Sequence, residues 1–130
     1  KVIKNMENFD FTIINYANPD MVGHTGDLNA TIQAIEKVDD CLGKIIKKVL
    51  NFNGIALVTA DHGNAEQMID PLNGLADTEH TSNPVPFICV SKQKLVLKKQ
   101  NGRLIDLTPT ILNLFGLNIP KQMKGQILIG

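Results

Sequence analysis

The stretch IALVTADHG, residues 55–63, decides the fold because an apolar run leads directly into a carboxylate and an imidazole. Residues 55–59 form a short, continuous apolar segment, as in strands that are buried on both faces. Asp61 and His62 follow this segment almost at once. In open α/β sheets, ligands bind beyond the carboxyl ends of the strands. The stretch therefore predicts a buried strand with a functional site at its end.

The sequence on both sides of this stretch alternates between strand-like and helix-like patterns. From Leu28 the apolar residues recur every three or four positions, which predicts a long helix that ends near residues 51–54. Residues 9–16 (FDFTIINY) and 85–90 (VPFICV) predict two further strands. The order strand, helix, strand predicts a parallel α/β unit.

The C-terminal part predicts one more helix, and the middle of the chain predicts a long loop. Thr108-Pro109 begins the helix, since Pro suits a first helical turn, and Gly116 ends it. Residues 65–84 show neither the two-residue alternation of a strand nor the 3.6-residue repeat of a helix. A loop of this length inside a compact domain usually has a function. No internal repeat or linker divides the chain, so we expect one domain portion over residues 1–130.

Composition and charge exclude several classes of protein. The chain has 130 residues, and its 13 basic and 13 acidic side chains cancel. We therefore expect no attraction to nucleic acid or to an anionic membrane. The longest apolar runs fall well short of the roughly 18 residues that suggest a membrane span. Cys41 and Cys89 read as reduced, buried thiols, and a cytoplasmic location is expected.

All three histidines lie where a metal ligand would be expected. His24 follows Asp20 by four residues, in DMVGHTG, and His62 directly follows Asp61. His80 lies in the loop before the predicted strand 85–90, which brings it back toward the sheet. Each feature has a structural alternative: either Asp–His pair could be only a local hydrogen bond, and His80 could simply bond a backbone carbonyl.

Carboxylate and imidazole without a thiolate favour particular ions. An Asp and His set suits manganese or zinc, whereas an all-oxygen set would suggest magnesium or calcium. We expect Mn²⁺ first and Zn²⁺ second.

Three segments together carry a resemblance to a known family. DMVGHTG (20–26), VTADHGNAE (58–66) and HTSNPVPF (80–87) closely resemble the metal-binding segments of 2,3-bisphosphoglycerate-independent phosphoglycerate mutases, in the alkaline phosphatase superfamily. The resemblance continues through LIDLTPT (104–110) and MKGQ (123–126). It implies an α/β fold with an alkaline phosphatase-like, mostly parallel sheet flanked by helices. It also implies that residues 1–130 are a C-terminal part of the metal-binding domain of a longer enzyme.

The resemblance assigns the candidate ligands to two ions. It implies that Asp20, His24 and His80 hold one metal, and that Asp61 and His62 contribute to a second. In the family, a nucleophilic serine and an aspartate from earlier sequence complete the second site. The serine takes the phosphoryl group and returns it, so that 3-phosphoglycerate and 2-phosphoglycerate interconvert in glycolysis without 2,3-bisphosphoglycerate. The implied enzyme is a monomeric isomerase.

The chain departs from the family pattern in its nucleophile and its cations. Ser82 and Ser91 are its only serines, and neither has the helix-start context of the nucleophile. Arg103 is its only arginine, although a phosphoglycerate pocket needs several cations. The remaining basic cluster reads as a solvated edge: Lys92, Lys94, Lys98 and Lys99. We therefore expect no catalytic or substrate-binding residue in the chain, and no activity from it alone.

Two alternatives remain open from the sequence. A non-catalytic metal-binding module could have the fold without the nucleophile. Another superfamily enzyme, such as a phosphopentomutase, shares the Asp-His-Gly but usually lacks the Asn-Ala-Glu that follows it here. An exposed sheet edge would also favour self-association of the chain.

Overall fold

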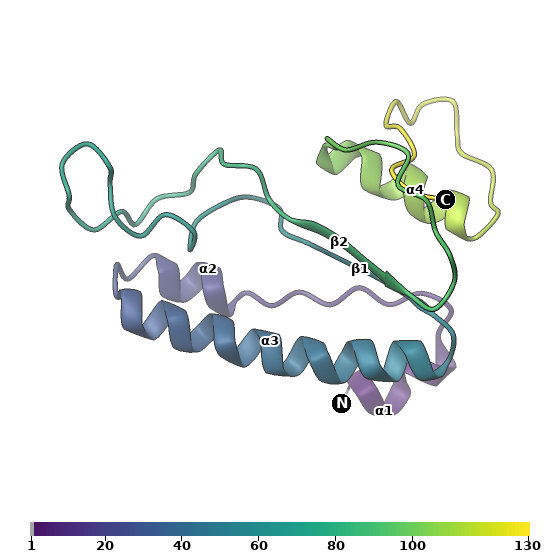
Figure 1. Cartoon of the computed structure of the whole chain (residues 1–130), viewed down its shortest axis with the longest axis horizontal. Coiled ribbons are helices and arrows are strands. Elements are labelled where there is room, and N and C mark those ends of the chain that lie inside the picture. The colour runs from purple at the N-terminus through teal and green to yellow at the C-terminus, as the bar shows by residue number, and fades with distance from the viewer. Residues whose placement is uncertain (1) are drawn as a thin grey trace. The chain divides into compact units, whose positions relative to one another are not determined.

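The computed structural model describes residues 2–130, which form two compact units that divide after Lys92. The first unit contains the helices α1 (Val2–Asn5), α2 (Asn18–Gly23) and α3 (Leu28–Asn51), a 3₁₀ turn (Met6–Asn8) and the strands β1 (Ile55–Thr59) and β2 (Phe87–Ser91). The second contains a 3₁₀ turn (Leu104–Asp106) and α4 (Leu107–Leu114). Helices with a small sheet confirm the expected α/β class (Figure 1).

The long helix α3 has the bounds that its periodicity predicts. Asp27 caps its first turn, since the carboxylate accepts a hydrogen bond from the Ala30 N–H at 3.0 Å. Beyond its end, Asn53 takes a positive φ of 56°, and Gly54 leads into β1. The buried side chains of α3 include Ile45, on the apolar face of the helix.

The two strands pair antiparallel, whereas the parallel unit that the sequence predicts joins residues 9–16 to residues 55–59 across the long helix. Ile55 lies opposite Ser91, and Thr59 lies opposite Phe87. Parallel neighbours need a crossover, usually a helix, between them. Here α3 precedes both strands, and the chain from 60 to 86 is a loop that turns back directly (Figure 1). Residues 65–84 are thus a long loop, as predicted.

The predicted strand at residues 9–16 is wrong, because neither described strand includes it, and the predicted parallel unit fails with it. The segment is irregular, and Phe9 and Ile13 are 64% and 80% exposed. The alternating pattern gives a chain strand-like faces, but only pairing with a neighbour makes a strand. At its end, Tyr16 lines a shallow hollow with Val38 and Cys41 of α3, and burial raises the Tyr16 pKa.

Buried polar residues hold the second unit together. Asp106 is fully buried and accepts hydrogen bonds from the backbone N–H groups of Gln126 and Arg103, at 2.7 and 2.9 Å. The Thr110 hydroxyl donates to the Asp106 carbonyl at 2.7 Å and accepts from the Leu128 N–H at 2.9 Å. These bonds tie the C-terminal segment to the start of α4.

The Lys99 side chain is partly exposed, and its Nζ also lies 3.9 Å from the buried Asp106 carboxylate, a contact that the sequence interpretation as a solvated edge did not include. Cys41 and Cys89 are free and partly buried, and burial raises the Cys89 pKa. Among the described helices, none is both long and apolar enough to cross a bilayer.

Replacing Thr110 by Val should destabilise the second unit by about 1–3 kcal/mol, because the buried Leu128 N–H loses its acceptor. Amide hydrogen exchange at Leu128 measures the effect, and the exposed Thr108→Val is the matched control. Equal Leu128 protection in both variants would show that the hydroxyl does not hold the segment.

Asp106 should make stability fall in acid. Hydrogen bonds from the Gln126 and Arg103 N–H groups lower its pKa, outweighing the effect of burial. A lowered folded pKa gives stabilisation that is complete above the unfolded value of about 3.9 and is lost as the pH falls toward the folded value. Thermal unfolding from pH 6 to 2 should therefore show a smaller acid loss for Asp106→Asn than for wild type. Parallel curves would contradict this role.

Candidate metal site

The short helix α2 places the first two candidate ligands on one side. Asp20 lies in its first turn, and His24 directly follows its last residue. Residues four apart lie on the same helix face. His24 Nε2 accordingly lies 3.4 Å from Asp20 Oδ1.

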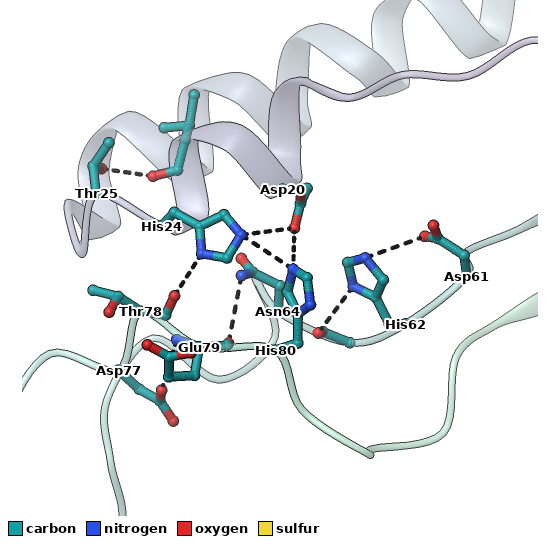
Figure 2. Close-up of polar contacts among 12 residues, drawn as sticks. Asp20, His24, Thr25, Asp61, His62, Asn64, Asp77, Thr78, Glu79 and His80 are labelled. Atoms are coloured by element: carbon teal, nitrogen blue, oxygen red, sulfur yellow. Dashed lines mark hydrogen bonds and ion pairs between the residues drawn. The ribbon is translucent and has the colours of Figure 1, made fainter.

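His80 approaches this pair from the long loop, more than 50 residues later. Its Nε2 lies 3.1 Å from Asp20 Oδ1 and 3.1 Å from His24 Nε2. Figure 2 shows the three side chains pointing toward one another. Asp20, His24 and His80, which the sequence predicts as one set, thus form a triangle of donor atoms.

The triangle has dimensions that fit a metal ion. Oxygen and nitrogen ligands at about 2.0–2.2 Å from a shared tetrahedral or octahedral ion lie about 3.0–3.5 Å from one another. The three measured separations lie in this range. One carboxylate with two imidazoles is a donor set that binds divalent transition metals such as zinc and iron.

The His24 ring is oriented by a bond on its far side. Its Nδ1 lies 2.6 Å from the Thr78 carbonyl oxygen. Because a carbonyl only accepts, Nδ1 carries the proton, which leaves the Nε2 lone pair available to an ion lying between Asp20 and His80. A backbone carbonyl behind a ligating histidine is the usual outer support of a metal site.

Asp61 and His62 lie beside the triangle, at the end of β1. His62 Nε2 is 3.7 Å from Asp61 Oδ1, and the Asp61 side chain is 81% exposed. The His62 ring stacks on the His80 ring, with centroids 3.8 Å apart. A His62 ring nitrogen lies within 4.8 Å of donor atoms of Asp20 and His80. The structure therefore places His62 next to Asp20 and His80, although the sequence grouped it only with Asp61.

Asn64 and Gly23 allow these segments to meet. The Asn64 side chain is buried, its Nδ2 donates to the Glu79 carbonyl at 3.4 Å, and its Oδ1 has no hydrogen-bond partner among the described residues. A Cβ on Gly23 would collide with this amide. Gly23 thus lets the end of α2 approach residue 64 closely.

Sequence reasoning missed the residues that support the loop. Glu66 accepts hydrogen bonds from Asn64, Thr81 and Asn83. The Thr81 hydroxyl is the largest cause that lowers the Glu66 pKa to about 2. The Gln67 amide likewise lowers the pKa of Asp77. The polar residues that follow Asp61-His62 were the available signal, but their partners are some 10 to 17 residues away.

The two serines lie in different surroundings. Ser82 is exposed in the loop after His80. Ser91 is opposite Ile55, at the other end of the strand pair from Asp61. Arg103 belongs to the second unit, where its backbone N–H binds Asp106.

Known proteins are similar to this chain in sequence. A family model described as the Metalloenzyme superfamily matches residues 1–119. The 2,3-bisphosphoglycerate-independent phosphoglycerate mutase of Clostridium kluyveri is 53% identical over 95% of this chain, and that of Clostridioides difficile is 51% identical over 95%. The chain spans 24% of the length of each relative. The resemblance noted from the motifs is therefore confirmed.

A solved structure shares the fold. The phosphoglycerate mutase of Leishmania mexicana, crystallised at low cobalt concentration, superposes with a TM-score of 0.82 at 34% identity. The match covers 99% of this chain and 27% of that one. The expected alkaline phosphatase-like α/β fold is thereby confirmed.

Gly23→Ala should destabilise the first unit by about 1–3 kcal/mol, because the new methyl group must displace the Asn64 amide. Gly43→Ala is the matched control: it lies in α3, where an added methyl group would meet no other atom within 4 Å, and it should stabilise the helix by about 0.5–1 kcal/mol. Thermal unfolding measures both. If the two variants shift the melting temperature in the same direction, the contact at Gly23 is not close.

Proposed function

Because the chain belongs to the Metalloenzyme superfamily, we propose that it supplies the metal-binding part of a phosphoglycerate mutase. The proposed reaction interconverts 3-phosphoglycerate and 2-phosphoglycerate through a phosphoserine, in cytoplasmic glycolysis. The observation that carries the proposal is the triangle of Asp20 Oδ1, His24 Nε2 and His80 Nε2, with sides of 3.1 to 3.4 Å.

Asp20, His24 and His80 would hold one ion, and Asp61 and His62 would contribute to a second. Two bound ions, with Mn²⁺ favoured over Zn²⁺, would supply the positive charge that phosphoryl transfer requires. The chain's own contribution is to hold donors in place. Asp20 brings a negative charge, while the bond from His24 Nδ1 to Thr78 keeps Nε2 available.

The other parts of the proposed reaction would come from outside this chain. The chain spans about a quarter of its curated relatives, and neither Ser82 nor Ser91 lies in the triangle. We therefore assign the nucleophile and the phosphate-binding cations to the remainder of a longer enzyme. The substrate would be a small phosphorylated acid, with no nucleic acid or membrane partner.

Metal binding tests the proposed ligands. The double variant Asp20→Ala, His24→Ala should lose at least 10-fold in Mn²⁺ affinity, because two of three donors are removed. Isothermal titration with Mn²⁺ measures this, and Asp39→Ala on the exposed side of α3 is the control. Identical affinities for the double variant and wild type would refute the site.

Activity tests the division of roles. The purified 130-residue chain should convert no 3-phosphoglycerate, with or without Mn²⁺, because the proposed nucleophile is not among its residues. A coupled assay for 2-phosphoglycerate gives the readout, with a complete mutase as positive control. Turnover by the chain alone would overturn this assignment.

A further inference from the structure

The two loop segments that carry His62 and His80 are joined by little backbone structure. Gly63 and Thr81 form an isolated antiparallel bridge, in which the Thr81 N–H donates to the Gly63 carbonyl at 2.9 Å. His62 and His80 directly precede these two residues, and their rings stack. A second isolated bridge, between Ile69 and Ala76, lies farther along the same loop. Two isolated bridges leave much of the ordering entropy of the loop to be compensated by other contacts.

A single carboxylate binds both segments. Glu66 Oε2 accepts the Asn64 N–H at 2.7 Å. Glu66 Oε1 accepts the Thr81 hydroxyl, and also the Asn83 side-chain N–H at 3.0 Å. We call these four residues the Glu66 clamp. Each of its two chain segments lies within two residues of a histidine.

The acceptor of the clamp is an ionised carboxylate that lies against the bridge, although the Glu66 side chain is exposed. The bonds that Glu66 accepts lower its pKa to about 2, so it is a carboxylate at neutral pH. Hydrogen bonds to an ionised acceptor are roughly twice as strong as neutral ones. A Cβ on Gly63 would collide with both the Thr81 hydroxyl and the Glu66 carboxylate, so the carboxylate rests directly against the bridge.

We propose that Glu66 is a positioning residue of the site, which fixes the His80 ring against the His62 ring through Thr81 and Asn64. It acts through its hydrogen bonds to the loop segments and not as a ligand, since the clustered donor atoms that could hold an ion include those of Asp20, His62 and His80 but none of Glu66. A donor held in place before binding loses less entropy when the ion arrives. The inference rests on the proposed function only in taking the triangle as a metal site.

Ring contacts in the metal-free chain test the clamp directly. Wild type should show a strong nuclear Overhauser effect between carbon-bound ring protons of His62 and His80. Thr81→Val should lose it, because Val has no hydroxyl, and Thr81→Ser should restore it. Glu66→Gln should weaken this effect. The amide NH₂ group of Gln cannot accept a hydrogen bond, so only one of the two accepting oxygens remains. Glu36→Gln, at an exposed position of α3, is the matched control. An unchanged effect in Thr81→Val and Glu66→Gln would overturn the proposal.

Titration with Co²⁺ tests the consequence for binding. Glu66→Gln and Thr81→Val should each bind Co²⁺ about 10-fold more weakly than wild type, as for other outer supports of metal ligands, with altered visible absorption. Thr81→Ser and Glu36→Gln should match wild type. If wild type binds and all four variants bind equally, Glu66 does not position the site. If wild type does not bind Co²⁺, the proposed metal function fails, and the ring contacts still decide the role of Glu66.

Discussion

Three distant segments meet where Gly23 lies against the Asn64 side chain, and the candidate site depends on this contact. Asp20 and His24 belong to one side of it, and His62 to the other. Asn64 also reaches the Glu79 carbonyl, next to His80. Because a methyl group on Gly23 would collide with the Asn64 amide, the approach is possible only with the smallest residue. The separations of about 3 Å between the donor atoms follow from that approach.

Hydrogen bonds of polar side chains, some buried and some exposed, join segments of both units that are distant in sequence. In the part of the chain that the structure describes, the fully buried side chains include Thr31, Asp106 and Thr110. Glu66 and Asp106 play similar parts in the two units. The exposed Glu66 carboxylate accepts from the Asn64 N–H and the Thr81 hydroxyl, and the buried Asp106 carboxylate accepts from the backbone N–H groups of Arg103 and Gln126. Such bonds are directional, so they specify which segments meet as well as stabilising the contact.

Local patterns predicted the regular elements because those elements depend on neighbouring residues. The periodicity from Leu28 and the run at 55–59 match α3 and β1, and the Pro and Gly signals match α4. The same reasoning failed for residues 9–16, and with them for the parallel unit across α3. A strand requires a partner, and its direction depends on the path of the connection. Neither property is encoded in a local alternation of side chains.

The sequence by itself determined which residues could bind a metal, since Asp and His at fixed positions have fixed donor chemistry. It also indicated that Asp20 and His24 share a helix face, because their spacing of four residues is a local property. The resemblance to the mutases grouped His80 with this pair. Only the tertiary structure decided how close His80 comes to Asp20, that its ring stacks on His62, and that Glu66 joins the two loop segments. Those relations depend on the return path of a loop of more than 20 residues. That path is set by packing and hydrogen bonds between distant residues, which no local pattern records.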